Sequence, residues 1–461
     1  GGAFSGFSVV TIDAGSMAIA DVGSDLFGVS LRTTTGGLSA GAITAPGNIL
    51  IDSAATASIG ALRTDSGIDI LAGGNTSVTS ADAVTRVVMT VDGNLTSGAI
   101  NASGLTAAAD INVTGDAQIA SVTAGGLIDV DLGGALTGGT FDAGGTLTID
   151  AASIDIASAS SDTFGVGLRA TSGALAADAL TAAGSVQVAS AAGATLGTID
   201  AGANIDVTAG GDSTIGSATA DGNLTVSITG NLSSGALLAG AGLSILDLNV
   251  SGDAQVSSAR SAFILDADVG GALTGGAFAS GSTTIDGGSI DLASVDGSGA
   301  GGVIANAVNG DAAIGALNSG GNATVNALAG AVTLGTLNTV LNGRLNGASI
   351  ALDQGTIGAD LEVAASAGDI AGTGAITVGG RIDLNASGNV GFGSLAAQGG
   401  GFTVGAGGDI AFTAASSSDR IAMTAAGDIL GGNLTAPNAI QLSAARIAIG
   451  NATAGSIGLT S

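Results

Sequence analysis

The sequence lacks most of the residue types on which enzyme chemistry depends. It contains no cysteine, histidine, tryptophan or tyrosine, and its nine basic residues are all arginine. Without histidine and cysteine, the chain cannot form a Ser-His-Asp triad, a Cys-His dyad, a zinc site or an iron–sulfur site. Without lysine it can form neither a P-loop nor a Schiff base. The polar chemistry that remains is that of Asp, Arg, Ser and Thr.

Other absences exclude further classes. The formal net charge is −28, which disfavours binding to nucleic acid or anionic lipid. Gly, Asp, Ser or Thr interrupts every apolar stretch, so no apolar run is long enough to span a membrane. A mean hydropathy of +0.58 is too high for a disordered chain. The chain also does not begin with Met, and we expect it to be processed or part of a longer protein.

The apolar residues that are present are small and aliphatic. Hydrophobic residues make up 46% of the sequence, aromatic residues only 2%, and glycine occupies 83 positions. Such a chain has apolar area to bury but few bulky side chains with which to fill a wide core. This composition predicts a narrow core built from many thin layers.

A long tandem repeat runs through the first two thirds of the chain. The segment SDLFGVSLR at Ser24 returns as SDTFGVGLR at Ser161, and GGALTGG at Gly133 returns at Gly270. We therefore divide residues 1–297 into two tandem copies preceded by the end of an earlier one. The copies are 24–160 and 161–297, the earlier fragment is 1–23, and a divergent continuation covers 298–461.

A short period of about 19–20 residues is nested inside the long one and continues beyond it. Alternating apolar pairs mark each period, as expected of strands with one face inward. The pairs are Val29/Leu31, Ile49/Ile51, Ile68/Ile70, Met89/Val91, Ile111/Val113, Ile128/Val130, Leu147/Ile149, Val166/Leu168, Leu361/Val363, Ile382/Leu384, Phe402/Val404, Ile421/Met423 and Ile440/Leu442. Glycine-rich steps separate them, for example at Gly47-Asn48 and Gly380-Arg381, and we expect these residues to adopt the positive φ of sharp corners.

A constant period of this length predicts an all-β fold, a right-handed parallel β-helix or β-solenoid. The aliphatic pairs should form continuous inward stacks, at Ile49, Ile51 and their successors. Phe27 and Phe164 should occupy equivalent places inside or at corners. Phe4, Phe141 and Phe278 should likewise be equivalent.

The turns resemble those of the filamentous-haemagglutinin-like adhesins and autotransporter passengers of Gram-negative bacteria. The resemblance rests on turns of the type GNILID, GRIDLN and GDILGG, and it covers essentially the whole chain as a style of repeat. It implies a secreted or cell-surface adhesin without enzymatic activity. The secretion domain of that family has no counterpart in this sequence.

Outward acidic and basic residues recur at the spacing of one turn. Asp13, Arg32 and Asp52 should stack on one another, as should Asp150 and Arg169, and these five form a structural charge ladder. No catalytic residue and no cofactor is expected. The weak candidates for a calcium site are Asp129, Asp131, Asp150, Asp266, Asp268 and Asp286.

The sequence thus predicts a structural, adhesin-like rod at the surface of a Gram-negative bacterium. Self-association into fibres or matrix is expected, and cell-surface glycans are further candidate partners. The alternative is a β-helical enzyme that acts on polysaccharides, or a carbohydrate-binding protein. The even corner spacing and the absence of Trp and Tyr argue against the enzyme. An ice-binding solenoid would need a regular T-x-T ladder, which the sequence does not contain.

Overall fold

A computed structural model describes all residues, 1–461, and is entirely β. It contains 47 strands and no helix. The strands pair in parallel with partners about 19 residues away and form about 24 turns of a β-solenoid. The predicted fold class is therefore confirmed. No helix in the structure has the length and apolarity to cross a membrane.

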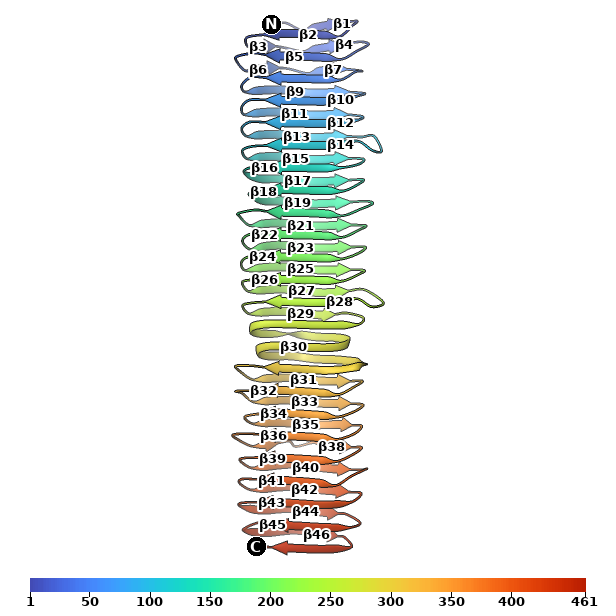
Figure 1. Ribbon diagram of the computed structural model, residues 1–461, viewed down its shortest axis with the longest axis vertical. Helices are drawn as coiled ribbons and strands as arrows, with labels where there is room; N and C mark the ends of the chain where they lie inside the picture. Colours follow the sequence, from blue (N-terminus) through green and yellow to red (C-terminus); the bar gives the residue numbers. More distant parts are fainter. The chain divides into compact units, whose positions relative to one another are not determined.

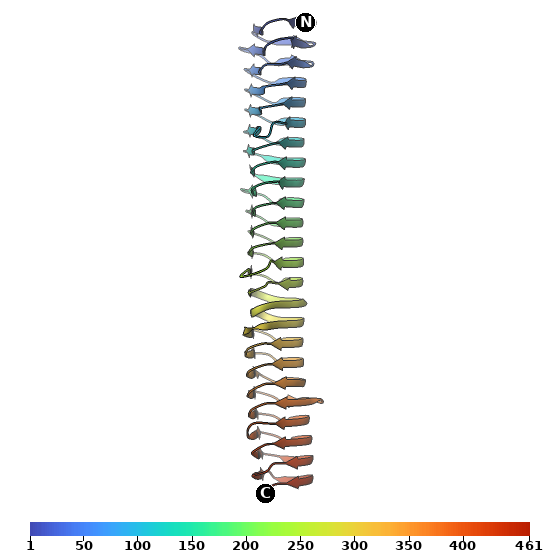
Figure 2. The ribbon, with the colours of Figure 1, turned by 90° about the vertical axis from the view of Figure 1, so that its right-hand side faces the viewer.

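The contacts divide the chain into two units. Unit 1 comprises Gly1–Gly222 and Val226–Gly230, and unit 2 comprises Asn223–Thr225 and Asn231–Ser461. In Figure 1, unit 1 runs from blue to green, with its strands stacked in parallel rows. Figure 2 shows that successive turns within each unit follow the same path.

Each turn consists of one short and one long strand. In one turn of unit 1, β14 (Ala108–Val113) is followed by β15 (Ala117–Ala124), and β16 (Ile128–Leu132) begins the next turn. Buried and outward residues alternate, but the two central residues of the long strand both face outward. The long strand therefore bends, and each turn has three narrow faces. The first face is the outward side of the short strands, and the second and third faces belong to the two halves of the long strands.

The following bounds apply in unit 1. β1 (Phe4–Gly6) pairs with β4 (Val22–Ser24) of the next turn, and β2 (Val10–Ala14) is the first short strand. β3 (Met17–Ile19) and β4, like β6 (Leu38–Ala40) and β7 (Ile43–Ala45), are the separated halves of a long strand. The other short strands are β5 (Val29–Thr33), β8 (Ile49–Ser53), β10 (Gly67–Ala72), β12 (Arg86–Val91), β14, β16, β18 (Leu147–Ala151), β20 (Val166–Ala170), β22 (Val186–Ser190) and β24 (Ile205–Ala209). The long strands are β9 (Ala57–Thr64), β11 (Thr76–Ala83), β13 (Leu95–Ala102), β15, β17 (Ala135–Ala143), β19 (Ser153–Ser161), β21 (Leu175–Ala182), β23 (Ala194–Ala201) and β25 (Ser213–Ala220). β26 (Leu224–Ile228) contributes residues to both units.

Unit 2 repeats the same plan. Its long strands are β27 (Leu232–Ala239), β29 (Ala254–Arg260), β31 (Ala312–Ser319), β33 (Val332–Thr339), β35 (Ile350–Ile357), β40 (Val390–Ala397), β42 (Ile410–Ser417), β44 (Asp428–Thr435) and β46 (Arg446–Thr453), with β37 (Ile370–Ala371) and β38 (Ala375–Val378) as separated halves. The short strands are β28 (Ile245–Val250), β32 (Ala323–Ala327), β34 (Gly343–Gly347), β36 (Leu361–Ala365), β39 (Ile382–Ala386), β41 (Phe402–Ala406), β43 (Arg420–Ala425), β45 (Ala439–Ser443) and β47 (Ser456–Thr460). β30 (Ile264–Ala307) continues through several corners without a break.

The core consists of continuous aliphatic stacks, as predicted. The inward positions expected from the alternation in the first copy are buried. They are Ile49, Ile51, Ile68, Ile70, Ile111, Val113, Ile128, Val130, Leu147 and Ile149. One detail of register differs, because Met89 in β12 pairs with Ile70 rather than with Ile68. The Met89/Val91 and Ile111/Val113 pairs therefore lie one inward position later in their turns than the sequence period suggested.

The phenylalanines divide into inward and corner positions. Phe27 and Phe164 are equivalent, and both lie at corners with similar exposure, 53% and 60%. Phe141 and Phe278 are equivalent and fully buried. The expected equivalence of Phe4 with these two does not extend to burial, since Phe4 lies in the first turn and is 45% exposed.

The expectation that corner residues adopt positive φ is wrong. No residue other than glycine has a positive φ, and among the glycines only Gly242 and Gly302 do. The corner glycines serve a different purpose, because a Cβ atom would collide with the backbone of the neighbouring turn. A Cβ at Gly47, for example, would lie 2.8 Å from the backbone nitrogen of Gly28. Glycine is needed there for the close approach of two turns rather than for a special dihedral angle.

The Asn and Asp residues at corners bind the next turn. The side chain of Asn75 accepts a hydrogen bond from the backbone N–H of Asn94 at 2.9 Å. Asn94 accepts one from Asp116 at 2.9 Å, and Asp116 accepts one from Ala135 at 2.8 Å. The G-N and G-D steps thus build ladders that satisfy backbone donors at the corners, where no strand partner is available.

Candidate functional site

A column of acidic and basic side chains follows the first face of unit 1. Arg32 lies in register between Asp13 and Asp52, and its Nε is 3.3 Å from Oδ2 of Asp52. Asp150 lies in register with Arg169, and Nη1 of Arg169 is 3.9 Å from Oδ1 of Asp150. The structure therefore brings the residues of the expected charge ladder together. Because these side chains are partly exposed, each pair contributes at most about 1 kcal/mol.

Further ion pairs also join neighbouring turns, but the sequence did not predict them. Arg86 Nη2 is 2.7 Å from Asp69 Oδ2, and Arg446 Nη2 is 2.7 Å from Asp428 Oδ2. In both pairs the arginine is the first residue of its strand. Arg446 is in register with Asp428, whereas Arg86 is in register with Gly67 and reaches two residues farther along the preceding turn. Both sequence spacings are shorter than the repeat period, which is why the repeat did not reveal these pairs.

The first face also carries a cluster of carboxylates in each tandem copy. Asp129 is in register with Asp110, and Asp131 is in register with Asp150. Partial burial raises the pKa of Asp129 above its usual value, and repulsion from these three neighbouring carboxylates raises it further. The cluster is therefore electrostatically unfavourable in the folded protein at neutral pH.

The second copy has the same arrangement in unit 2. Asp266 and Asp268 lie in β30, and Asp266 is in register with Asp247. Partial burial raises the pKa of Asp266, and repulsion from Asp247, Asp268 and Asp286 adds to the effect. No group of three or more acidic side chains is arranged to hold a metal ion. Calcium binding by these residues stays a prediction.

A ladder of amides extends from the second acidic cluster. The Asn306 side chain donates to Asp286 at 2.6 Å, Asn326 donates to Asn306 at 2.7 Å, and Asn346 donates to Asn326 at 2.7 Å. These four residues lie at the same outward position of successive turns on the first face. Each amide offers both a donor and an acceptor, so each asparagine can donate to the preceding turn and accept from the next.

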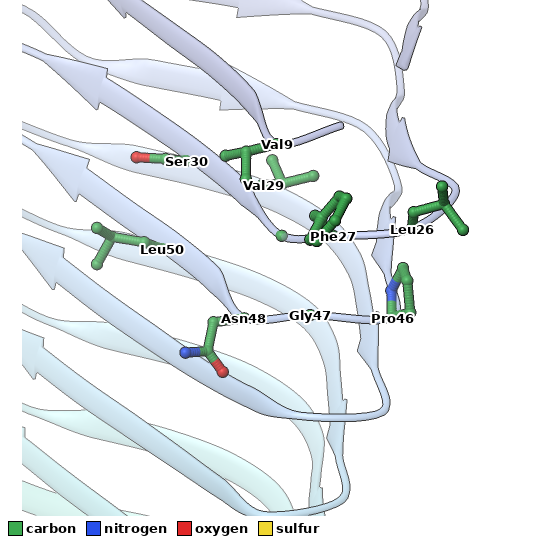
Figure 3. A pocket seen from close by; sticks show the side chains of 10 residues that line it. Val9, Leu26, Phe27, Val29, Ser30, Pro46, Gly47, Asn48 and Leu50 are labelled. Carbon is green, nitrogen blue, oxygen red and sulfur yellow. The ribbon is translucent and has the colours of Figure 1, made fainter. Parts of the chain in front are cut away.

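An apolar hollow lies at the corner that carries Phe27. It has a volume of about 410 Å³ and is open to solvent. Figure 3 shows Phe27 beside Val9 and Val29, with Leu26 and Pro46 close by and Leu50 farther along the face. A hydroxyl group fixes this corner: Ser24 donates to the carbonyl oxygen of Ser8 at 2.9 Å and accepts from the N–H of Phe27 at 3.1 Å.

The corner at Phe164 is built in the same way. Ser161 donates to the carbonyl oxygen of Gly145 and accepts from the N–H of Phe164 at 3.2 Å. The apolar lining is repeated only in part, since Val166 corresponds to Val29 but Thr163 and Ala183 stand where the first copy has Leu26 and Pro46. Both copies keep the serine and the exposed phenylalanine.

The fold and these surfaces define the chain as a parallel β-solenoid, compatible with a β-helical passenger-like protein. No protein-family model, no curated protein and no solved structure matches the chain.

Proposed function

We propose that this protein is a non-enzymatic, adhesin-like structural solenoid, secreted or held at the surface of a Gram-negative bacterium, and that it self-associates. The observation that carries this proposal is the exposed phenylalanine at the same serine-fixed corner of both tandem copies, Phe27 and Phe164. Exposing an aromatic side chain forfeits part of the roughly 1.5–3 kcal/mol that its burial contributes. A partner that covers it recovers that free energy.

A second copy of the chain is the partner that fits best. Seven register steps separate the two corners, from Val29 through successive short strands to Val166. At about 4.8 Å per step, the spacing is roughly 34 Å. Another copy carries the same spacing, so both contacts can form at once and reinforce each other. Cell-surface glycans are a further class of partner in this proposal.

The test compares the native chain with the Phe27→Ser/Phe164→Ser variant by sedimentation velocity and electron microscopy. The native chain should form assemblies whose size increases with concentration, and the variant should shift strongly toward the monomer. Val84→Ser is the matched control. Val84 is an exposed apolar residue at an equivalent corner whose counterpart in the second copy is Asp221. A native chain that stays monomeric, or a double variant that assembles like the native chain, would refute self-association through these corners.

A further inference from the structure

Comparison of the two tandem copies separates residues that the fold requires from residues that it does not. The block GDAQ…GGALTGG occurs at 115–139 and again at 252–276. Asp116 and Asp253 each accept a backbone N–H of the next turn, from Ala135 and Ala272 at 2.8 Å. The fold therefore explains why both copies retain the aspartate.

The retained glycines are also explained by packing. A Cβ atom at Gly138 would lie 2.9 Å from the ring of the buried Phe141, and one at Gly139 would collide with the carbonyl oxygen of Ala120. Gly276 has the same relation to the carbonyl oxygen of Ser257. These positions exclude any side chain.

On the second face, two retained residues have no such explanation. Gln118 and Thr137 point outward on the second face, are exposed, and form no side-chain hydrogen bond. Their counterparts in the second copy are Gln255 and Thr274. Outward residues of the third face do change between the copies. The changed pairs include Arg63/Asp200, Asp82/Thr219, Thr123/Arg260 and Asp142/Ala279.

Gln118 and Thr137 line one hollow of about 550 Å³. Thr96, Gln118 and Thr137 are neighbours in register, so their polar groups form a row along the second face. Two glycines, at 138 and 139, lower the surface beside this row. Ser97 also lines the hollow, is only 5% exposed, and has a hydroxyl group without a hydrogen-bond partner.

We propose that this hollow, and the matching residues Ser233, Gln255 and Thr274 of the second copy, bind an uncharged polyhydroxylated chain, that is, a neutral glycan. None of the lining residues is charged, and their amide and hydroxyl groups both donate and accept hydrogen bonds, as sugar hydroxyls do. Because the row advances by about 4.8 Å per turn, the ligand must be extended and lie across successive strands. This inference deepens the adhesive part of the proposed function and rests on it.

The experiment applies the full chain to a panel of immobilised neutral hexasaccharides with α-1,4, β-1,4 and β-1,3 linkages, and to a hexamer of galacturonic acid. We expect saturable binding to at least one neutral chain and none to the acidic one. The Gln118→Ala/Gln255→Ala variant should bind about tenfold more weakly, the effect of losing roughly one hydrogen bond per site. Gln187→Ala is the matched control, because Gln187 is exposed on the first face and its counterpart in the other copy is Leu50.

Circular dichroism and sedimentation of the same variants separate the outcomes. Both variants should have the native spectrum, since the substituted residues are exposed. Absence of binding to every neutral chain, or equal loss in Gln187→Ala and in the double variant, would overturn the inference. If assembly through Phe27 and Phe164 persists in that case, self-association stands and only the glycan site is wrong.

Discussion

The burial of Phe141 provides a direct test of the layered core. Phe141 is fully buried in β17, in register between Val122 and Ala159. Its ring occupies the space that Gly138 leaves empty. The perturbation is Phe141→Ala, and the matched control is Phe164→Ala, the same change at a residue that is 60% exposed.

The expected magnitudes follow from these environments. Fully burying a phenylalanine side chain contributes about 1.5–3 kcal/mol. Measured Phe→Ala changes in cores cost about 3–5 kcal/mol, because the cavity that incomplete relaxation leaves adds to the lost burial. Relaxation should be small here, since the inward neighbours are held in parallel strands on both sides. The control should change stability by about 0.5 kcal/mol or less.

Hydrogen exchange is the appropriate assay. The chain has no Trp or Tyr for intrinsic fluorescence, and solenoids unfold through neighbouring repeats rather than in one step. In Phe141→Ala, amides of β15, β17 and β19 should exchange about 100-fold faster or more, because each step of about 1.4 kcal/mol is a factor of ten. In Phe164→Ala, the amides of these three strands should exchange as in the native chain. Equal protection in the two variants would contradict the assignment of inward and outward positions.

Three further predictions concern the core, the acidic cluster and the corners. Ile149→Asp buries an unpaired charge and should lower the unfolding free energy by several kcal/mol, about 3 or more, seen as lost protection of β18. Asp129→Asn should raise the melting temperature at pH 7 but not at pH 3. Because the pKa of Asp129 is raised in the folded protein, the stability that its protonated form contributes is fully present below the usual pKa of 3.8 and is lost as the pH rises through the folded pKa. A melting temperature at pH 7 that falls in this variant would contradict the repulsion. Asn94→Ala removes the acceptor for the N–H of Asp116 and should cost about 1 kcal/mol, measured as faster exchange of that amide, whereas Asn101→Ala, on the third face, should leave it unchanged.

Most of the fold could be predicted from the periodicity of the sequence. Alternation within a turn, and its return in the next turn, predict both which side chains are buried and which stack, as at Ile128 and Leu147. The ion pairs of Arg32 and Arg169 are predicted in the same way, from a sequence spacing of one turn. These predictions succeed because parallel strands in register convert sequence spacing directly into contact.

Features that depend on distances between turns could not be predicted in this way. The collision that reserves Gly47 for glycine involves Gly28 of another turn, so local turn chemistry suggested a positive φ instead. The bend in the long strands depends on two consecutive outward residues, a pattern too short to recognise without the pairing register. The retained Gln118 and Thr137 were visible as repeated letters, but their lack of any structural partner could be seen only in the folded chain.

The scarcity of aromatic residues is itself a consequence of the solenoid and gives meaning to the exceptions. A layer is only about 4.8 Å thick, so an inward ring needs space from a neighbouring position. Phe141 takes that space from Gly138, and a Cβ at Gly431 would likewise collide with the ring of Phe412. An outward ring meets no such steric limit. An exposed apolar side chain does, however, forgo the free energy of burial, which favours polar residues at the surface. The fold therefore does not require a phenylalanine at 27 or 164, and the presence of one at the same serine-fixed corner of both copies is the observation on which the proposed contact with a second chain rests.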